Sequence, residues 1–277
     1  MNAVLKYPWL RKLDDDTSYE YEKFGAYRDD GEAFLFARQG SDGNAKSLEA
    51  QIMDHADAIA YAVHDLSDFY KAGLLDFSSL KKSGSSELDR HMIKNEGKIL
   101  RHTNMSMTDA KDYIVRNVLW YLDGDQYNSG ATHEISQITR DSQLISKLIN
   151  DSLKVELIGE DFNLIIPPQV HLTINFLKSI IWDYIIMRPQ LGTQQRGQIQ
   201  IISTLFEFYL KSIIDEDYRM LPSEYRDEVN QERLLVGDTQ KKVRLAVDLV
   251  ARLSENQAIS IFGRISGARV GSILEYI

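Results

Sequence analysis

Residues 47–70 read Ser47-Leu-Glu-Ala-Gln-Ile-Met-Asp-His-Ala-Asp-Ala-Ile-Ala-Tyr-Ala-Val-His-Asp-Leu-Ser-Asp-Phe-Tyr70. Apolar side chains recur here at helical spacing, which predicts one amphipathic helix over the whole stretch. Ser47 is placed to cap its N-terminus, and Glu49 is an acid in the first turn, where the helix dipole favours negative charge. The apolar stripe consists of Ile52, Ala56, Ile59, Ala60, Val63, Leu66 and Phe69.

The other edge of this helix is acidic. Asp57, Tyr61 and Asp65 recur four residues apart and are predicted to share one face. Like charges on one face repel by a few tenths of a kcal/mol per pair, so a cation or solvent must compensate. Two interpretations follow. The face is simply solvated, as charge runs usually are, or it binds metal and substrate, which the interleaved tyrosine and small alanines favour.

Composition limits the classes of function. The chain has 277 residues, 43% of them hydrophobic, which is enough for a sizeable core in one large domain or two small ones. A net charge of −9 without a basic run gives no strong signal for nucleic-acid binding, although basic pockets for small anions remain open. Because cysteine is absent, a metal must be held by histidine and carboxylates. Neither a signal peptide nor a membrane-spanning stretch is recognisable, so we expect a cytoplasmic protein without a membrane partner.

The periodicities predict an all-α chain with at most one short β-hairpin, near residues 155–166. We expect a single domain over residues 1–277, irregular with short helical pieces over 1–46 and helical over 47–277. Residues 79–86 read as a linker, and residues 188–193 separate two strongly apolar helices. Beyond residue 70 the predicted helices cover residues 109–122, 133–153, 170–187, 195–214, 245–253 and 257–262, with a short one after Gly267.

Residues 49–68 resemble the third motif of the dNTP triphosphohydrolases, the deoxyguanosinetriphosphate hydrolase branch of the HD superfamily. The resemblance implies part of an HD-domain-like helical bundle in which residues 1–46 face the substrate. Supporting stretches occur in the family's order and cover nearly the whole chain: Leu5-Lys-Tyr-Pro-Trp9, Lys23-Phe-Gly-Ala-Tyr27, Pro189-Gln-Leu-Gly-Thr-Gln-Gln-Arg-Gly197 with Leu205-Phe206, and Val243-Arg-Leu-Ala-Val-Asp-Leu-Val-Ala251.

The same resemblance implies roles for individual residues. Asp57 would be the last ligand of a divalent metal such as Mn²⁺ or Mg²⁺. Tyr61 and Asp65 would pack against the deoxyribose and hold its 3'-hydroxyl. Lys6 and Lys23 would bind the triphosphate, although a solvated loop surface is an equally good interpretation for these two lysines. The positions that would bind the triphosphate or lie near the nucleotide are Lys6, Tyr7, Lys23 and Arg196, the last of them across a subunit interface.

The metal site that the family implies is incomplete in this sequence. The family's upstream histidine and its His-Asp pair should precede Lys6, and by alignment the dipeptide His64-Asp65 is not that pair. One carboxylate cannot hold a catalytic metal, which normally needs three or more protein ligands. We therefore expect a fragment, one of two chains that assemble the site, or a paralogue that lost the chemistry. If the rest of the site is absent, apolar surface should be exposed around Val4, Leu5, Trp9 and Leu10.

The leading hypothesis is a polypeptide that converts a dNTP to deoxynucleoside and triphosphate when its HD half is present, as a homo-oligomer or with a chain that supplies that half. The first alternative is a non-catalytic nucleotide-binding or regulatory subunit. The second is a helical scaffold whose acidic face is solvated.

Overall fold

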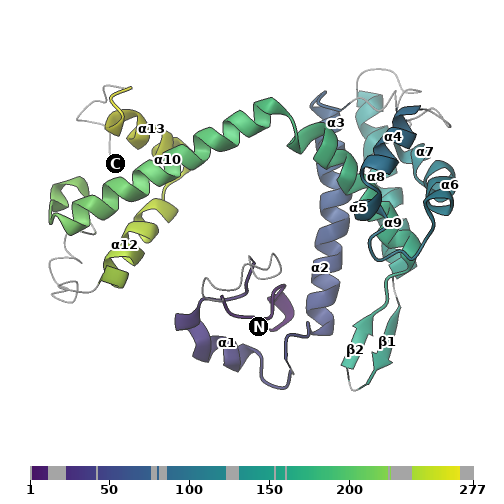
Figure 1. Ribbon diagram of the computed structural model, residues 1–277, viewed down its shortest axis with the longest axis horizontal. Helices are drawn as coiled ribbons and strands as arrows, with labels where there is room; N and C mark the ends of the chain where they lie inside the picture. Colours follow the sequence, from purple (N-terminus) through teal and green to yellow (C-terminus); the bar gives the residue numbers. More distant parts are fainter. Residues whose placement is uncertain are drawn as a thin grey trace. The chain divides into compact units, whose positions relative to one another are not determined.

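The structure is a computed structural model, and it describes residues 2–11, 23–41, 43–75, 80, 86–122, 131–152, 154–159, 161–223, 225 and 239–268. The chain divides into two compact units, Met1–Met187 and Arg188–Ile277, which are described separately here. Both are helical where they are described, and unit 1 adds a two-stranded sheet (Figure 1). The all-α class with one short hairpin is confirmed. A single domain over residues 1–277 stays a prediction.

The helix predicted over residues 47–70 is present. It consists of α2 (Leu48–Ala60), a π-helical turn (Tyr61–Asp65) and α3 (Leu66–Lys71), which follow one another without a break (Figure 1). Its N-cap is as predicted, because the Ser47 hydroxyl accepts a hydrogen bond from the Ala50 backbone N–H. The π-helical turn was not predicted, since periodicity alone does not distinguish it from an α-helix.

Several other helices of unit 1 pack against this element or α9. The predicted helices over 133–153 and 170–187 are confirmed with boundaries shifted by a few residues, whereas the helix predicted over 109–122 is divided into α6 and α7 at Val118. Two short helices, α4 and α5, lie in a stretch for which no helix was predicted. The bounds are α1 (Gly31–Ala37), α4 (Ser86–Lys94), α5 (Glu96–Ile99), α6 (Met107–Asn117), α7 (Leu119–Leu122), α8 (Ala131–Ser152) and α9 (Pro168–Ile181), which continues as a π-helical turn (Trp182–Ile186).

Helix α9 is the centre of unit 1. It is buried on most sides, and its half-buried stripe carries the polar residues His171, Asn175 and Lys178. It contacts the π-helical turn Tyr61–Asp65 as well as α5, α6 and α8. The acidic helix and the apolar helix are therefore neighbours, and candidate residues on one can meet side chains of the other.

The predicted hairpin is present as β1 (Val155–Ile158) and β2 (Asp161–Leu164), paired antiparallel. Gly159 in its turn has φ 68°, a backbone conformation that favours glycine. Gln51 of α2 accepts a hydrogen bond of 2.9 Å from the Leu164 backbone N–H, so the hairpin is tied to the start of the acidic helix.

Unit 2 consists of α10 (Pro189–Ile214), a 3₁₀ turn (Tyr218–Met220), α12 (Thr239–Ala251) and α13 (Glu255–Ile265). The prediction that residues 189–193 are not helical was wrong. Pro189 begins α10, because proline fits the first turn of a helix, where its missing N–H is not needed. The helix predicted after Gly267 and most of the predicted linker at 79–86 lie outside the described residues. The core side chains are Tyr209, Ile213, Leu221, Tyr225, Ala246 and Leu249.

Two further surface features bear on the sequence predictions. Val4 is largely exposed, while Leu5, Trp9 and Leu10 are half-buried, so none of these four apolar side chains is fully covered. Within the described ranges, every helix is too short or too polar to cross a lipid bilayer.

Candidate functional site

The acidic face of α2 meets lysines from the N-terminal segment. Lys6 Nζ lies 2.6 Å from Asp57 Oδ2 and 2.8 Å from Asp54 Oδ1. Lys46 forms a second ion pair with Asp54. The chain itself therefore supplies the cations that this face was expected to need.

These contacts shift the pKa values of Lys6 and Asp54. Burial alone would lower the pKa of the Lys6 ammonium, but its hydrogen bonds to Asp54 and Asp57 outweigh burial and raise that pKa. Burial would raise the pKa of the Asp54 carboxyl, but Lys46 and Lys6 lower it. Lys6 and Asp54 are therefore both charged at neutral pH.

We predict that Asp54→Asn makes the protein less sensitive to acid. A carboxyl whose folded-state pKa is lowered stabilises the fold above its ordinary pKa, and this contribution is lost as pH falls through the folded-state value. In urea denaturation at pH 7 the variant should lose about 1 kcal/mol of unfolding free energy, near the upper end for partly exposed ion pairs. At a pH well below the folded-state pKa of Asp54 the two proteins should be equally stable.

The matched control is Asp112→Asn, which removes an exposed carboxylate 3.5 Å from Arg116 within one helix. Its free energy of unfolding, both at pH 7 and at low pH, should differ from that of the unmodified protein by no more than a few tenths of a kcal/mol. An equal loss of unfolding free energy in both variants at pH 7 would contradict the stabilising role of the ion pairs that Asp54 forms with Lys6 and Lys46.

The described residues do not complete a metal site. Within them, no group of three or more histidine or carboxylate side chains lies close enough to hold a metal ion. A catalytic metal normally needs at least three protein ligands. The metal role of Asp57 therefore stays a prediction, and further ligands would have to come from outside the described residues.

Tyr61 and Asp65 both lie in the π-helical turn, a rare conformation that is frequent at functional sites. The Tyr61 ring is 38% exposed, and Lys178 Nζ of α9 lies 5.4 Å from its centroid. Burial and the neighbouring Asp68 raise the pKa of the Asp65 carboxyl. The structure thus places both predicted sugar-binding residues beside α9.

The two lysine motifs of the N-terminal segment lie side by side. The Trp9 indole N–H donates to the Lys23 backbone oxygen at 2.7 Å, and Lys23 Nζ lies 5.8 Å from the Tyr7 ring centroid. Gly25 packs so closely that a Cβ there would lie 2.3 Å from the Tyr7 carbonyl oxygen, so a larger residue would force the motifs apart. Arg196 is exposed on α10 in unit 2, and its predicted role is not tested.

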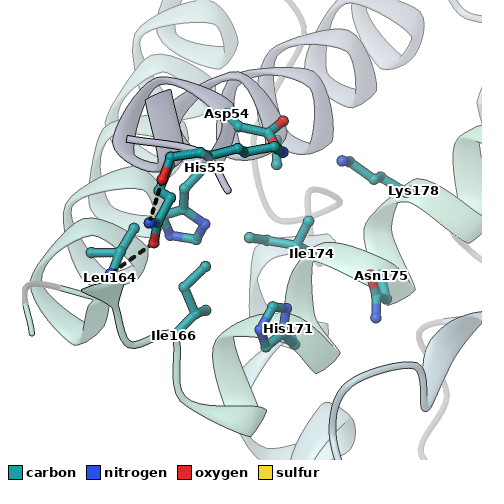
Figure 2. Close-up of a pocket in the computed structure, with 11 residues that line it drawn as sticks. Asp54, His55, Leu164, Ile166, His171, Ile174, Asn175 and Lys178 are labelled. Carbon is teal, nitrogen blue, oxygen red and sulfur yellow. Dashed lines mark hydrogen bonds and ion pairs between the residues drawn. The ribbon is translucent and has the colours of Figure 1, made fainter. Parts of the chain in front are cut away.

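A pocket of 280 Å³ lies between α2 and α9. Figure 2 shows Asp54 and His55 on α2 facing His171, Ile174 and Lys178 of α9 across it. Both helices carry polar side chains into it, His55 and the neutralised Asp54 from α2 and His171 and Lys178 from α9, and Leu164 and Ile166 add apolar surface. The lining residues are Lys46, Gln51, Asp54, His55, Ala58, Leu164, Ile166, His171, Ile174, Asn175 and Lys178.

A second pocket, of 530 Å³, adjoins the first, since Asn175 and Lys178 line both. It carries three cations and no carboxylate. Two aromatic side chains also line it, and Lys98 Nζ lies 4.4 Å from the ring centroid of Trp182. Its lining residues are Tyr61, Lys98, Arg101, Asn175, Lys178, Ser179 and Trp182. We call this the cationic pocket.

Lys178 is the cation that the two pockets share. Burial lowers the pKa of its ammonium, the charge of Lys6 lowers it further, and the charges of Asp57 and Asp54 oppose the change. In the part of the chain that the structure describes, no carboxylate forms an ion pair with Lys178, Lys98 or Arg101. An anion bound here would relieve the repulsion among these cations.

Sequence reasoning missed Lys98, Arg101, Lys178 and Trp182. One signal was available for Lys178, because it is the one lysine in a helix of which nine residues are buried, and lysine is rare in buried segments. Nothing local marks Lys98 or Arg101, which reach the pocket only through the packing of α5 on α9.

Comparison with known proteins connects this geometry to a family. Residues 164–264 match a family described as phosphohydrolase-associated domain. A deoxyguanosinetriphosphate triphosphohydrolase-like protein of Streptomyces coelicolor is 24% identical over 278 residues, which is 96% of this chain. A protein of the same name from Bifidobacterium longum is 26% identical over 94% of this chain. The predicted family resemblance is confirmed.

The similarity to these dGTP triphosphohydrolase-like proteins has two limits. The chain spans 62% of the Streptomyces coelicolor protein and 55% of the Bifidobacterium longum protein. Identity is higher only locally, at 41% over 80 residues with a relative from Corynebacterium efficiens, which is 29% of this chain. The names of the relatives indicate hydrolases that act on a deoxynucleoside triphosphate.

Proposed function

We propose that this chain binds a deoxynucleoside triphosphate in the two adjoining pockets and takes part in its hydrolysis to deoxynucleoside and triphosphate. The names of the dGTP triphosphohydrolase-like relatives support the substrate class. The observation that carries the proposal is the cationic pocket, in which three cations and two aromatic rings converge without a carboxylate.

The chemistry of the pockets suits such a ligand. A triphosphate needs several cationic donors whose charge is not already neutralised, and Lys98, Arg101 and Lys178 meet this requirement. The rings of Tyr61 and Trp182 offer flat apolar faces for the sugar and the base. Lys178, at the junction of the pockets, would contact the ligand from either side.

Tyr61 is proposed to select the deoxy sugar. It lies one turn after Asp57 on the wall of the cationic pocket, where its ring would crowd the position of a ribose 2'-hydroxyl. Asp65, in the same π-helical turn, would accept a hydrogen bond from the 3'-hydroxyl. Asp57 is proposed to bind a divalent metal such as Mn²⁺ or Mg²⁺ together with ligands outside the described residues.

We predict that the chain binds dGTP more tightly than GTP in calorimetric titration, and that Tyr61→Ala reduces this preference about tenfold. The reason is that a pocket shape that excludes one hydroxyl discriminates by one to two orders of magnitude. Trp120→Ala is the matched control, since Trp120 is also 38% exposed but lines neither pocket. A chain that binds neither nucleotide would be a scaffold, and the proposal would be wrong.

A non-catalytic nucleotide-binding subunit is the alternative. It is favoured by one observation, namely that the described residues include no group of three metal ligands. Release of triphosphate from dGTP in the presence of Mn²⁺ distinguishes the two when the assay also contains a polypeptide that supplies the family's upstream histidine and His-Asp motifs. Hydrolysis that Asp57→Asn abolishes would support the enzyme, whereas nucleotide binding without hydrolysis would support the alternative.

A further inference from the structure

His91 is the centre of a buried polar cluster between α4 and α9. Its Nε2 lies 2.8 Å from the Ser179 hydroxyl oxygen, and its Nδ1 lies 3.1 Å from Asp183 Oδ2. The residue is only 4% exposed. One imidazole ring therefore bridges two residues that are one turn apart on the same helical element.

Asp183 has further partners from the end of α4. The Asn95 side-chain amide donates to Asp183 Oδ2 at 2.7 Å, and Lys94 Nζ lies 3.0 Å from Asp183 Oδ1. Asp183 belongs to the π-helical turn Trp182–Ile186, and such turns are rare in helices. Tertiary contacts of this kind are what keeps such a turn in place.

This cluster lies directly behind the cationic pocket. Ser179 and Trp182 line the pocket from α9 and the turn that follows it, whereas Lys98 and Arg101 line it from α5 and the residues after it. Through His91, α4 thus holds the wall that carries Ser179 and Trp182, and α4 is followed in the chain by α5, which carries Lys98.

The order Ser179, His91, Asp183 resembles the arrangement of a nucleophilic serine. The surroundings of Ser179 argue against that role. It is 3% exposed, and its hydroxyl donates a 2.7 Å hydrogen bond to the Phe176 carbonyl oxygen of its own helix. Whether it donates to Phe176 or to His91, the hydroxyl is too deeply buried to act as an attacking group, and it serves as a link within the structure.

We propose that His91 is a positioning residue of the cationic pocket, which holds Ser179 and Asp183 and thereby fixes Trp182 against Lys98. This inference rests on the proposed function, because the pocket is the one assigned to the nucleotide. It goes beyond that function because His91, which does not itself line the pocket, would determine the position of Trp182, which does.

The hydrogen-bond pattern makes the bridge depend on a proton. In the neutral ring, Nδ1–H donates to Asp183, and Nε2 can only accept, so Ser179 must turn its one hydrogen away from Phe176. In the protonated ring both nitrogens donate, and Ser179 keeps its bond to Phe176. The protonation of His91 therefore decides which bond the pocket-lining Ser179 makes.

The charged and titratable groups around the ring come from two elements. Asp183 and Tyr184 face it from the π-helical turn, and Lys94 and Glu87 act on it from α4. Burial lowers the pKa of His91 below its usual 6.5, although the Asp183 carboxylate opposes this. Hydrogen bonding of Ser179 should consequently change in the range below pH 6.5.

Fluorine NMR of 5-fluorotryptophan-labelled protein tests the inference without nucleotide. The resonance of Trp182, assigned with Trp182→Phe, should shift with pH and have its midpoint below 6.5. In His91→Gln, which keeps a neutral polar side chain, this shift should disappear. In His102→Asn, which removes an exposed imidazole, the shift should remain, since asparagine tolerates the φ of 62° at that position.

Nucleotide binding gives the second measurement. At pH 7.5, His91→Leu should weaken dGTP binding about tenfold, because it leaves Asp183 and Ser179 without their shared partner. His91→Gln should restore most of that loss. If His91→Leu does not fold, His91→Gln alone carries the test.

Two results would overturn the inference. One is a Trp182 resonance that does not respond to pH in the unmodified protein, and the other is an equal response in His91→Gln. If the unmodified protein fails to bind dGTP, the proposed function is contradicted, and the fluorine titration still decides whether His91 positions Trp182.

Discussion

Replacing Lys178 with methionine is expected to weaken dGTP binding by about 10- to 100-fold in calorimetric titration. A hydrogen bond to a charged group contributes about 1.5–3 kcal/mol, and every 1.4 kcal/mol changes affinity about tenfold. Lys178 lines both pockets, so a ligand in either one would lose this contact. Methionine keeps the apolar stem that packs in α9 and removes only the charge.

The matched control for this prediction is Lys154→Met. Lys154 is an exposed lysine before β1 that pairs with Glu156 and lines neither pocket. Its replacement should leave dGTP affinity within about twofold, since exposed ion pairs contribute little. Equal affinities for both variants would place the triphosphate elsewhere and contradict the assignment of the cationic pocket.

Phe176→Ala is expected to lower the free energy of unfolding by about 3–5 kcal/mol, the range for removing a fully buried aromatic ring. Phe176 is 0% exposed and lies in the middle of α9, around which unit 1 is packed. The loss includes the transfer of the ring from the core and the cavity that it leaves. Urea denaturation followed by far-UV circular dichroism measures it.

Phe162→Ala makes the same change at an exposed position. Phe162 lies on β2 and is 59% exposed, so its removal should cost no more than about 0.5 kcal/mol. A similar loss in both variants would mean that α9 is not the centre of the core. Because both positions lie in unit 1, the comparison does not depend on unit 2.

The local features of the fold were predictable because neighbouring residues decide them. The apolar stripe and the Ser47 cap lie within residues 47–70, where each residue meets partners three or four positions away. The hairpin followed in the same way from two short runs around Gly159. The start of α10 at Pro189 was missed, because a proline was read as a break although it fits the first turn of a helix.

The candidate site was predictable only in part, for the same reason. Asp57, Tyr61 and Asp65 lie on one helix, and their spacing is a local property. The counter-charge of Asp57 is not local, since Lys6 is 51 positions away in the sequence. Lys178 comes from a helix more than a hundred residues later.

The sequence by itself therefore determined the helical class, the acidic helix over residues 47–70 and the resemblance to the dNTP triphosphohydrolases. Only the tertiary structure decided that Lys6 neutralises Asp57 and that α5 and α9 form the cationic pocket. It also decided that His91 contacts Ser179, which lines that pocket. The physical reason is that periodicity records contacts within one element. A pocket and its charges arise from the packing of elements distant in the chain.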